Sequence, residues 1–413
     1  MTGAPGVAIV GGGQAGFSVA STLRSAGYRG PVTVLAGEPH LPYQRPPLSK
    51  KFLTDPGGAQ VHLVPESFFT EQEIDLCLGE QALAIDRTSR AVTTSAGRRV
   101  AYEHLVLATG ARNRGLPVPG SDLPGVHSLR SLDDAVKLRA ALATARDVVV
   151  VGGGFIGLEL AHAALAAGAR VTVVELAGRL LARAVSPELE RHLRERHERA
   201  GVHILTATHV LAVEGAGRAR QVVTDRGALP ADLVIYGIGI APRDELAREA
   251  GLAVDDGVIV DHQLRSVTDP RVSAVGDCAR HPHPHAAGLI RLESVQNATD
   301  SGVLVGRHLA GAPAPRPSVP WFWSDQGEFK LQIAGLRAAA DQVHLTPPDA
   351  AGRVAAYAFR DGHLVAVETL NWPAEHLAAR RLMDQRVLIS PADLAGTSLA
   401  ALTRSRRAAA AAS

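Results

Sequence analysis

The chain has 413 residues, of which 46% are hydrophobic and 20% are charged, as is typical of soluble globular proteins with two or three domains. The net charge of +2 argues against a protein that binds nucleic acid through overall positive charge. The two cysteines, Cys77 and Cys278, exclude a disulfide framework and favour a reducing compartment. Residues 1–6 lack the basic end and apolar core of a signal peptide, so we expect a cytoplasmic protein.

A glycine-rich turn follows the first apolar run of the chain. Val7–Val10 predicts a buried strand, and the spacing Gly11-x-Gly13-x-x-Gly16 leads from it into an alanine-rich helical pattern. In such a motif the first glycine permits the turn, the second lets a pyrophosphate approach the backbone, and the third lets helix and strand pack closely. The sequence therefore predicts a dinucleotide site, the alternative being a glycine turn without a ligand.

Two strand ends supply further candidates for this first site. The strand Val32–Leu35 is followed by Ala36, where an acid usually binds a ribose hydroxyl, so Glu38 is the nearest candidate for that role. The apolar strand that begins at Tyr102 leads into Thr109 and a glycine, a turn that would bring the backbone against a cofactor.

A proline-rich segment, Pro39–Leu53, carries two of the candidate cations. Its four prolines predict an ordered loop without a helix. Arg45 can bind a phosphate or a ring carbonyl of a cofactor, and Lys50 can place a positive charge near such a ring. The alternative for both is an ordinary solvated surface charge.

A second strand, glycine turn and helix begin at Asp147. The strand Val148–Val151 enters a turn with the same spacing of glycines, at Gly152, Gly154 and Gly157. The next strand ends at Glu175, where the acidic residue that binds a ribose is expected, so we predict NADH rather than NADPH. Arg179 and Arg183 lie downstream and would weaken that preference. A duplicated fold with one vacant site is the alternative to two bound dinucleotides.

Two later strands end in glycine turns of the same kind. The strand Leu233–Tyr236 leads into a turn containing Gly239, which we expect to line the nicotinamide side of the second site. The segment Val272–Asp277 places Asp277 at the carboxyl end of a strand, where it can accept hydrogen bonds from ribityl hydroxyls or cap the next helix. The tract His281-Pro-His283-Pro-His285 resembles a metal site but is predicted to be a loop without metal, because extended alternate histidines do not converge.

The pattern changes to antiparallel strands after a proline-rich linker, Ala312–Pro320. Trp321 and Trp323 share one face of a predicted strand, and a later hairpin turns at Asp361-Gly362. Pro373 opens an amphipathic helix, and the alanine-rich segment from Arg404 is expected to fray.

Five motifs together resemble the flavoprotein ferredoxin reductases of oxygenase and cytochrome P450 electron chains, which include the putidaredoxin reductase type. In chain order they are PYQRPPLSK, GGGFIGLELA, VGDCA, ESVQNA and WFWSDQ. The resemblance covers essentially the whole chain. It implies an α/β protein of the glutathione reductase fold, with two Rossmann-like dinucleotide-binding domains and an α+β C-terminal domain. The implied domains are FAD-binding (1–112 and 245–320), NADH-binding (113–244) and C-terminal (321–413).

The same resemblance implies roles for individual residues. FAD would occupy the Gly11 site and NADH the Gly152 site, and Glu159 would pair with Lys50 beside the N5 edge of the flavin. The residues implied around the FAD are Arg45, Lys50, Asp277, Val295 and Trp323. We take Lys50 and Glu159 as the catalytic candidates.

The positions of the cysteines decide the reaction class. Disulfide reductases of this fold need a redox cysteine pair, and NADH peroxidases need one cysteine soon after the second strand, but Leu41–Leu48 contains none. Cys278 is interpreted as a packed small residue. Without a thiol relay, a bound flavin must pass its electrons directly to an outside acceptor.

The sequence therefore predicts an FAD-dependent NADH:ferredoxin oxidoreductase that supplies a [2Fe–2S] ferredoxin of a cytochrome P450 or ring-hydroxylating oxygenase. The alternatives are a rubredoxin reductase, or an NADH-sensing flavoprotein like apoptosis-inducing factor. We expect a monomer or weak homodimer that binds no nucleic acid or membrane. An acidic ferredoxin would be steered by local arginines, for which the candidates are Arg291, Arg307 and Arg316.

Overall fold

Each of the two strand, glycine turn and helix segments belongs to a separate unit of the protein. The computed structural model describes residues 5–55 and 59–412. Of these, the first unit takes the residues within 1–44, 60–112 and 240–318, and the second those within 45–59, 113–239 and 319–413. The assignment of FAD and NADH to the predicted domains stays a prediction.

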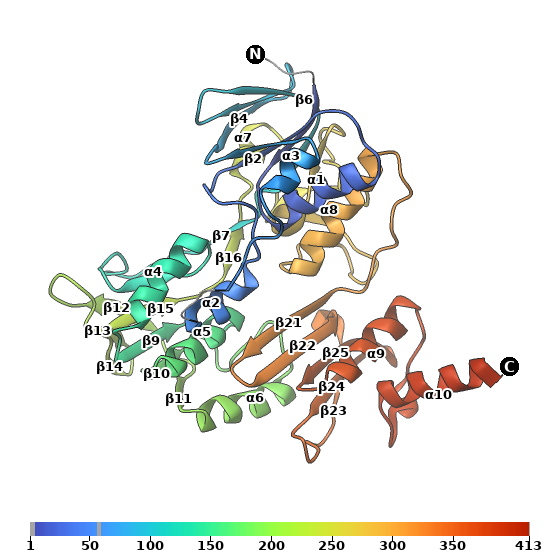
Figure 1. The fold of residues 1–413 in the computed structure, drawn as a ribbon. Helices are drawn as coiled ribbons and strands as arrows, with labels where there is room; N and C mark the ends of the chain where they lie inside the picture. Colours follow the sequence, from blue (N-terminus) through green and yellow to red (C-terminus); the bar gives the residue numbers. More distant parts are fainter. Residues whose placement is uncertain (1–4, 56–58, 413) are drawn as a thin grey trace. The chain divides into compact units, whose positions relative to one another are not determined.

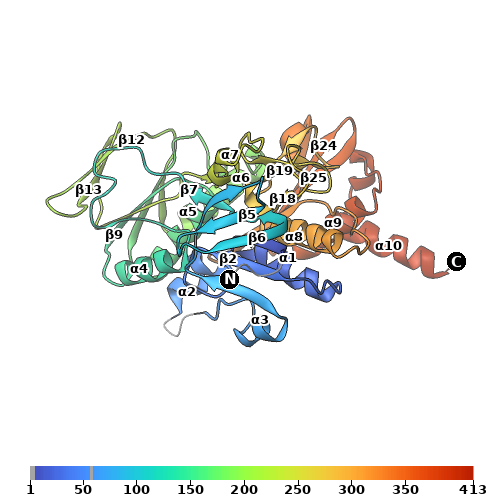
Figure 2. The ribbon, with the colours of Figure 1, turned by 90° about the horizontal axis from the view of Figure 1, so that it is seen from above.

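The first unit is built on a sheet whose central strand, β1 (Gly6–Val10), runs parallel to both β2 (Val32–Ala36) and β6 (Arg99–Leu107). Strand β1 is buried along its whole length, which explains its continuous apolar sequence. Helices α1 (Gln14–Ser25) and α8 (Val295–Leu309) pack side by side (Figures 1 and 2). The sheet is completed by β3 (Ile74–Leu78), β5 (Ala91–Thr94), β4 (Ala82–Asp86) and β18 (Val272–Ala274), the last parallel to β6.

Shorter elements surround this sheet. They are α3 (Ser67–Glu71), α7 (Glu245–Glu249), η2 (Gly276–Cys278), the pair β7 (Ala111–Asn113) and β16 (Ile240–Pro242), and the set β17 (Val258–Ile259), β19 (Ala279–Pro282) and β20 (Leu289–Ile290).

The second unit contains a parallel sheet of five strands and a separate antiparallel sheet of five strands. The parallel sheet has the order β11 (Val202–Leu205), β10 (Arg170–Val174), β9 (Asp147–Val151), β15 (Leu233–Tyr236) and β8 (Val126–Ser128). Its helices are α4 (Leu132–Leu142), α5 (Phe155–Ala166) and α6 (Pro187–Arg199). A three-stranded sheet follows with β12 (Val210–Glu214), β13 (Gln221–Thr224) and β14 (Gly227–Pro230).

The C-terminal residues form the antiparallel sheet predicted from their alternation. Its order is β21 (Trp321–Gln326), β22 (Phe329–Gly335), β25 (His363–Leu370), β24 (Val354–Arg360) and β23 (Gln342–Leu345). The other elements are η3 (Arg337–Ala339), α9 (Pro373–Asp384), η4 (Pro391–Leu394) and α10 (Leu399–Ala412). One apolar core joins this sheet to α9 and α10.

The prediction that the proline-rich segment contains no helical element was wrong. The proline-rich segment contains a 3₁₀ turn, η1 (Pro46–Ser49), and a single helical turn, α2 (Lys51–Thr54). Its prolines open the 3₁₀ turn, a position where the missing N–H leaves no bond unmade. The C-terminal segment is helical as far as Ala412, in keeping with the high helix propensity of alanine, and its expected fraying stays a prediction.

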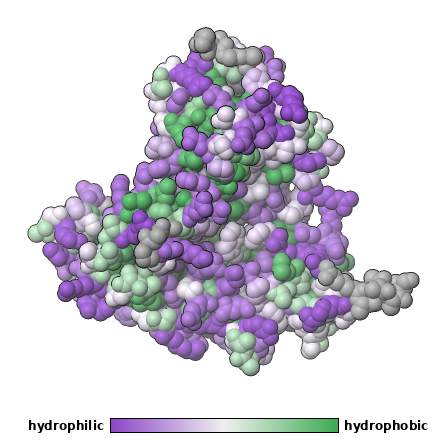
Figure 3. Space-filling model, viewed as in Figure 1, coloured by the Kyte–Doolittle hydropathy of each residue, from purple (hydrophilic) through white to green (hydrophobic). Residues whose placement is uncertain are grey.

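No helix in the part of the chain that the structure describes is long and apolar enough to cross a membrane. Hydrophilic residues cover most of the face drawn in Figure 3.

Candidate functional site

The first glycine turn leaves an open space at the start of α1. Gly11 has a φ of +123°, and a Cβ atom there would lie 2.1 Å from the carbonyl oxygen of Ala108, so only glycine fits. A Cβ atom on Gly13 would meet nothing within 4 Å. A Cβ atom on Gly16 would lie 1.9 Å from the Gly11 oxygen, which explains the close helix–strand packing. These residues fit the cradle of a dinucleotide pyrophosphate.

Distant parts of the sequence meet at this turn. A Cβ atom on Gly276, the residue before Asp277, would lie 3.0 Å from Cβ of Ala15 at the start of α1. Asp277 is half-buried in η2. Val295 is the first residue of α8, whose N-terminus is capped by the hydroxyl of Ser294. The structure therefore brings the Asp277 turn and the end of β1 into one region.

Glu38 and Thr109 lie at strand ends of the same unit. Glu38 follows β2 by two residues, and its Oε2 atom accepts a hydrogen bond of 2.5 Å from the hydroxyl of Tyr43. Thr109 follows β6 and donates from Oγ1 to the carbonyl of Arg243 at 2.6 Å. Their roles toward a cofactor stay predictions.

The second glycine turn repeats this geometry in the second unit. Gly152 has a φ of +108°, and a Cβ atom there would lie 2.5 Å from the carbonyl oxygen of Gly237. A Cβ atom on Gly154 would meet nothing within 4 Å, so the space above the turn is again open. Glu175 stands beside this turn, because Oε2 accepts from the N–H of Gly153 at 2.6 Å and Oε1 from the N–H of Ala177 at 2.7 Å. Gly157 packs as Gly16 does, with a Cβ atom 2.0 Å from the Gly152 oxygen.

The two arginines downstream of Glu175 differ in their surroundings. Arg179 donates to the carbonyls of Val185 and Ala182 at 2.7 and 2.5 Å, so its guanidinium holds the local loop together. Arg183 is exposed, and its Nη2 atom lies 3.5 Å from the position of a Cβ atom on Gly239. Of the two arginines, Arg183 is therefore the one near the predicted nicotinamide turn.

Lys50 and Glu159 form an ion pair in the second unit, with Nζ 3.4 Å from Oε1. Glu159 lies on α5 with 5% of its side chain exposed, and it also accepts hydrogen bonds from the hydroxyls of Ser49 and of Ser324, the latter at 2.6 Å. Burial raises the pKa of Glu159, and Lys50 and the two serines oppose that shift. Lys50 also contacts Asp325 at 3.2 Å.

Aromatic rings of β21 adjoin this pair. The Lys50 Nζ atom lies 5.8 Å from the ring centroid of Trp323, which stacks on Trp321 with a centroid separation of 5.4 Å. Arg45 donates to the carbonyl of Arg130 at 2.5 Å, so part of its guanidinium is bound to backbone. The sequence did not single out Ser49, Ser324 or Asp325, which lie within motifs quoted for the resemblance but carry no spacing that points to Glu159.

The cysteines are free and buried. Burial raises the pKa of the Cys77 thiol to about 12, and it raises the pKa of Cys278 as well. Thiols of this kind stay protonated and unreactive at neutral pH. The prediction that neither is a thiolate relay agrees with these environments.

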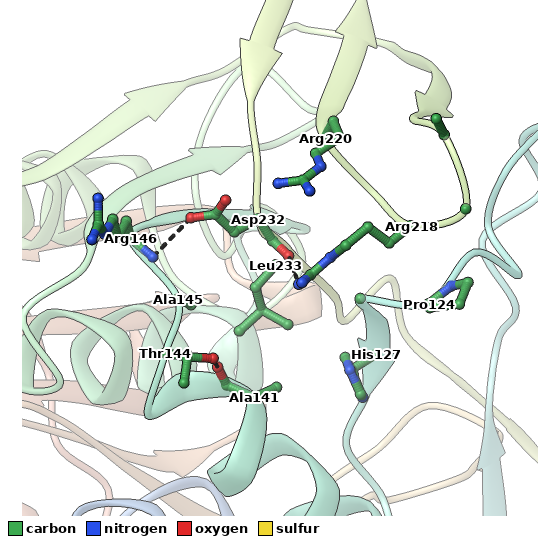
Figure 4. A pocket seen from close by; sticks show the side chains of 13 residues that line it. Pro124, His127, Ala141, Thr144, Ala145, Arg146, Arg218, Arg220, Asp232 and Leu233 are labelled. Atoms are coloured by element: carbon green, nitrogen blue, oxygen red, sulfur yellow. Dashed lines mark hydrogen bonds between the residues drawn. The ribbon is translucent and has the colours of Figure 1, made fainter.

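A pocket of about 720 Å³ lies at the other end of the parallel sheet from the Gly152 turn, at the amino ends of β9 and β15 (Figure 4). Asp232 accepts from the backbone N–H groups of Arg146 and Asp147 at 2.9 and 3.1 Å, and Arg218 donates to the carbonyl of Asp232. Dinucleotides bind at the carboxyl ends of such strands, so this pocket is not the predicted nucleotide site.

The prediction of a loop was wrong for the first part of the histidine tract, because His281 and Pro282 lie in β19, where they pair with β20. His283 and His285 lie in the turn that follows. The ring centroids of His281 and His283 are 5.8 Å apart, and those of His283 and His285 are 5.6 Å apart. Across residues 5–55 and 59–412, no group of three or more potential ligands is arranged to hold a metal ion.

Comparison with known proteins decides the family. Residues 5–302 match the family described as pyridine nucleotide-disulphide oxidoreductase, and residues 321–403 match a reductase C-terminal domain. The chain belongs to the pyridine nucleotide-disulphide oxidoreductase family. It is an oxidoreductase of the fold predicted from its sequence.

Within this family, the chain is similar to several reductases of electron-transfer proteins. The chain is 44% identical to a rhodocoxin reductase of Rhodococcus erythropolis over 95% of this chain and 92% of the relative. It is 42% identical, with a TM-score of 0.91, to the ferredoxin reductase for the CYP199A2 system from Rhodopseudomonas palustris, covering 94% and 96% of the two chains. It is 36% identical, with a TM-score of 0.89 and 94% of both chains covered, to the reductase in a covalent putidaredoxin reductase–putidaredoxin complex.

Proposed function

We propose that this protein is an FAD-dependent NADH:ferredoxin reductase. The observation that carries the proposal is the pair of open glycine turns, at Gly13 in the first unit and at Gly154 in the second, each at a helix N-terminus. Two such cradles in one chain suit two dinucleotides, one held and one exchanged. The chemistry that bound FAD would supply is uptake of a hydride from NADH and release of the two electrons, one at a time, to an outside acceptor.

The residues of the first unit would hold the FAD. Gly11, Gly13 and Gly16 admit the pyrophosphate to the start of α1, and Glu38 would bind the adenosine ribose. Asp277 follows Gly276, which lies beside the start of α1, and it would accept hydrogen bonds from the ribityl chain. Thr109 and Val295 complete the proposed set within this unit. Arg45 and Trp323, which the resemblance also implies around the FAD, belong to the second unit.

The residues of the second unit would orient NADH. The Gly152 turn would admit its pyrophosphate, and Glu175 would accept a hydrogen bond from the ribose 2′-hydroxyl through lone pairs that the backbone does not use. The turn at Gly239 would lie on the nicotinamide side. Glu175 repels a 2′-phosphate, so the proposal includes a preference for NADH.

Lys50 would supply positive charge where negative charge develops in the cofactor. Glu159 holds that charge in place, since it is buried and bonded to Lys50 on one side and to serine hydroxyls on the other. Neither residue needs to transfer a proton in this role.

The proposed acceptor is a [2Fe–2S] ferredoxin that serves a cytochrome P450 or a ring-hydroxylating oxygenase. The names of the relatives and the complex with putidaredoxin support an iron–sulfur partner. A rubredoxin is the second candidate, because a rubredoxin-NAD(+) reductase of Pseudomonas putida is 40% identical over 89% of this chain.

Of the three candidates for steering the partner, Arg291 has the least support. Arg291 is 10% exposed and paired with both Asp256 and Glu293, so its charge is largely neutralised. Arg307 and Arg316 remain proposed docking residues.

The test begins with the purified protein, which should release about one FAD per chain on denaturation. Cytochrome c reduction by NADH should then depend on an added [2Fe–2S] ferredoxin, with a rubredoxin tested in parallel. Failure to take up FAD would reject the proposal, and faster turnover with the rubredoxin would favour the second candidate.

A further inference from the structure

A continuous chain of hydrogen bonds leads away from Glu159 inside the second unit. The hydroxyl of Ser324 donates to Glu159 Oε1 at 2.6 Å, and Gln326 Nε2 donates to Ser324 Oγ at 3.1 Å. Gln326 Oε1 lies 2.9 Å from Nε2 of His197, and His197 Nδ1 lies 2.9 Å from Nε2 of His162. The five residues come from α5, α6 and β21.

Most of this chain is withdrawn from solvent. Ser324, Gln326 and His197 are 0% exposed, whereas His162 at the outer end is half-buried. The ring of Phe329 stands edge-on to both imidazoles, with centroids 5.6 Å from His162 and 5.7 Å from His197. The hydrogen bonds among Ser324, Gln326 and His197 therefore lie in the protein interior, where the electrostatic energy of a hydrogen bond is greater than at the surface.

The carboxylate end fixes the direction of every bond in the chain. An ionised Glu159 only accepts, so Ser324 donates to it and accepts from the amide of Gln326. The amide oxygen of Gln326 then faces His197, which must donate from Nε2. Burial lowers the pKa of His197 to about 3, so the ring is neutral and its Nδ1 atom accepts from His162. All four donors point toward Glu159.

We propose that His162, His197 and Gln326, acting through Ser324, form a positioning chain that keeps Glu159 ionised and thereby holds Lys50 in place. The inference rests on the proposed role of the Lys50–Glu159 pair. Donors aligned toward one negative charge polarise one another and stabilise it more than isolated bonds do. This offsets the burial that raises the pKa of Glu159.

The chain orients groups and does not conduct protons. An amide does not exchange its proton readily, so Gln326 interrupts any proton transfer between His197 and Ser324. Other charges face the two ends of the chain: Lys50, with Asp325 bonded to it, at the inner end and Glu328 near His162. Arg196 lies over the ring of Phe329 at 5.7 Å.

The first test reads the histidines by nitrogen NMR of ¹⁵N-histidine-labelled, FAD-loaded protein. Glu159→Gln removes the charge, and it should change the Nδ1 and Nε2 shifts of His197. When Glu159→Gln is made in a Ser324→Ala protein, the change in the two His197 shifts should be smaller by about threefold or more. The reason is that the hydrogen bond between Ser324 and Glu159 is then missing. An undiminished response would overturn the proposal, since it would show a direct field from Glu159, which lies three residues from His162 on α5.

The second test follows the pH dependence of flavin bleaching by NADH in Gln326→Met and His162→Gln. Protonation of Glu159 should slow bleaching at low pH, and Gln326→Met should move that midpoint upward by about half a pH unit or more. His162→Gln, at the half-buried end of the positioning chain, should shift the midpoint in the same direction by a smaller amount. This variant still tests the proposal if Gln326→Met does not fold. The matched control is His192→Gln, which changes a histidine of α6 that is not part of the positioning chain.

The outcomes separate the two proposals. If the pH midpoint of bleaching is unchanged in Gln326→Met, in His162→Gln and in the control His192→Gln, the positioning chain is rejected but the proposed function is not. A Lys50→Met enzyme that bleaches at the unmodified rate would reject the proposed role of the pair, whereas the NMR coupling would be unaffected.

Discussion

Glu175 accepts a 2.6 Å hydrogen bond from the backbone N–H of Gly153, so the acid at the end of β10 is fixed against the glycine turn of the same unit. A second N–H, from Ala177, holds its other oxygen. The carboxylate of Glu175 is therefore already fixed at the edge of the open turn, so binding of a nucleotide costs no further side-chain entropy there.

Glu175→Ala should reduce the preference for NADH over NADPH. The carboxylate offers an acceptor to the 2′-hydroxyl and repels a 2′-phosphate, and its loss should cost about tenfold in the ratio of kcat/KM, or about 1.4 kcal/mol. Steady-state kinetics with both nucleotides measures this, with the exposed Glu198→Ala on α6 as control. Equal kcat/KM for the two nucleotides in the unmodified enzyme would contradict the role of Glu175.

Lys50→Met should slow flavin reduction by NADH by about 10- to 100-fold, because it removes a preorganised positive charge. The apparent Kd for NADH should change much less. Stopped-flow bleaching measures both quantities. The neighbouring Lys51 is exposed and serves as the matched control, so Lys51→Met should bleach at the unmodified rate. Equal rates for the two variants would show that Lys50 is only a surface charge.

The sequence predicted the two nucleotide folds well because their signals are local. A buried strand, a glycine with positive φ and a helix start occupy adjacent positions, as at Val10, Gly11 and Gln14. The antiparallel C-terminal sheet followed from alternation, which depends only on neighbouring residues.

The surroundings of Glu159 were less accessible to sequence reasoning. The resemblance implied Lys50, but Ser324 lies 165 positions from Glu159 and reaches it only through the packing of β21 on α5. His197 and Gln326 gave no signal, since a single buried histidine and a strand glutamine have no characteristic spacing. The proline-rich segment misled for another reason: prolines exclude a helix interior but not its first turn.

His376 predicts how stability depends on acid. The side chain is 1% exposed, and neither ring nitrogen has a hydrogen-bond partner among the described residues. Burial, together with the charge of Arg380, lowers the pKa of His376 from its ordinary value of 6.5 to about 4. Below pH 6.5 this histidine therefore binds more protons in the unfolded protein than in the folded one. Stability should therefore fall as the pH drops from 6.5 toward 4, by up to about 1.4 kcal/mol per pH unit from this group.

His376→Leu should remove that loss and raise the melting temperature most at pH 5. Thermal unfolding at pH 7.5 and pH 5 compares it with His363→Leu, which changes an exposed histidine of β25. If His376→Leu is as sensitive to acid as the unmodified protein, His376 is not a source of the acid sensitivity.

Charge reversal at the proposed docking arginines should weaken only the step that involves the partner. Arg316 is exposed, and Arg307 donates from Nε to the carbonyl of Pro313 at 2.6 Å, which leaves the positive charge of its guanidinium uncompensated by that bond. Arg307→Glu and Arg316→Glu should each raise the KM for an acidic ferredoxin by about two- to fivefold at low salt, with the difference shrinking as salt screens the charges. Flavin bleaching by NADH should be unchanged in both variants, because this step is measured without the ferredoxin. Arg90→Glu, at an exposed turn of the first unit, controls for the change in net charge. If all three variants show the same KM and the same salt dependence, the ferredoxin is not steered by Arg307 or Arg316 and docks on another surface.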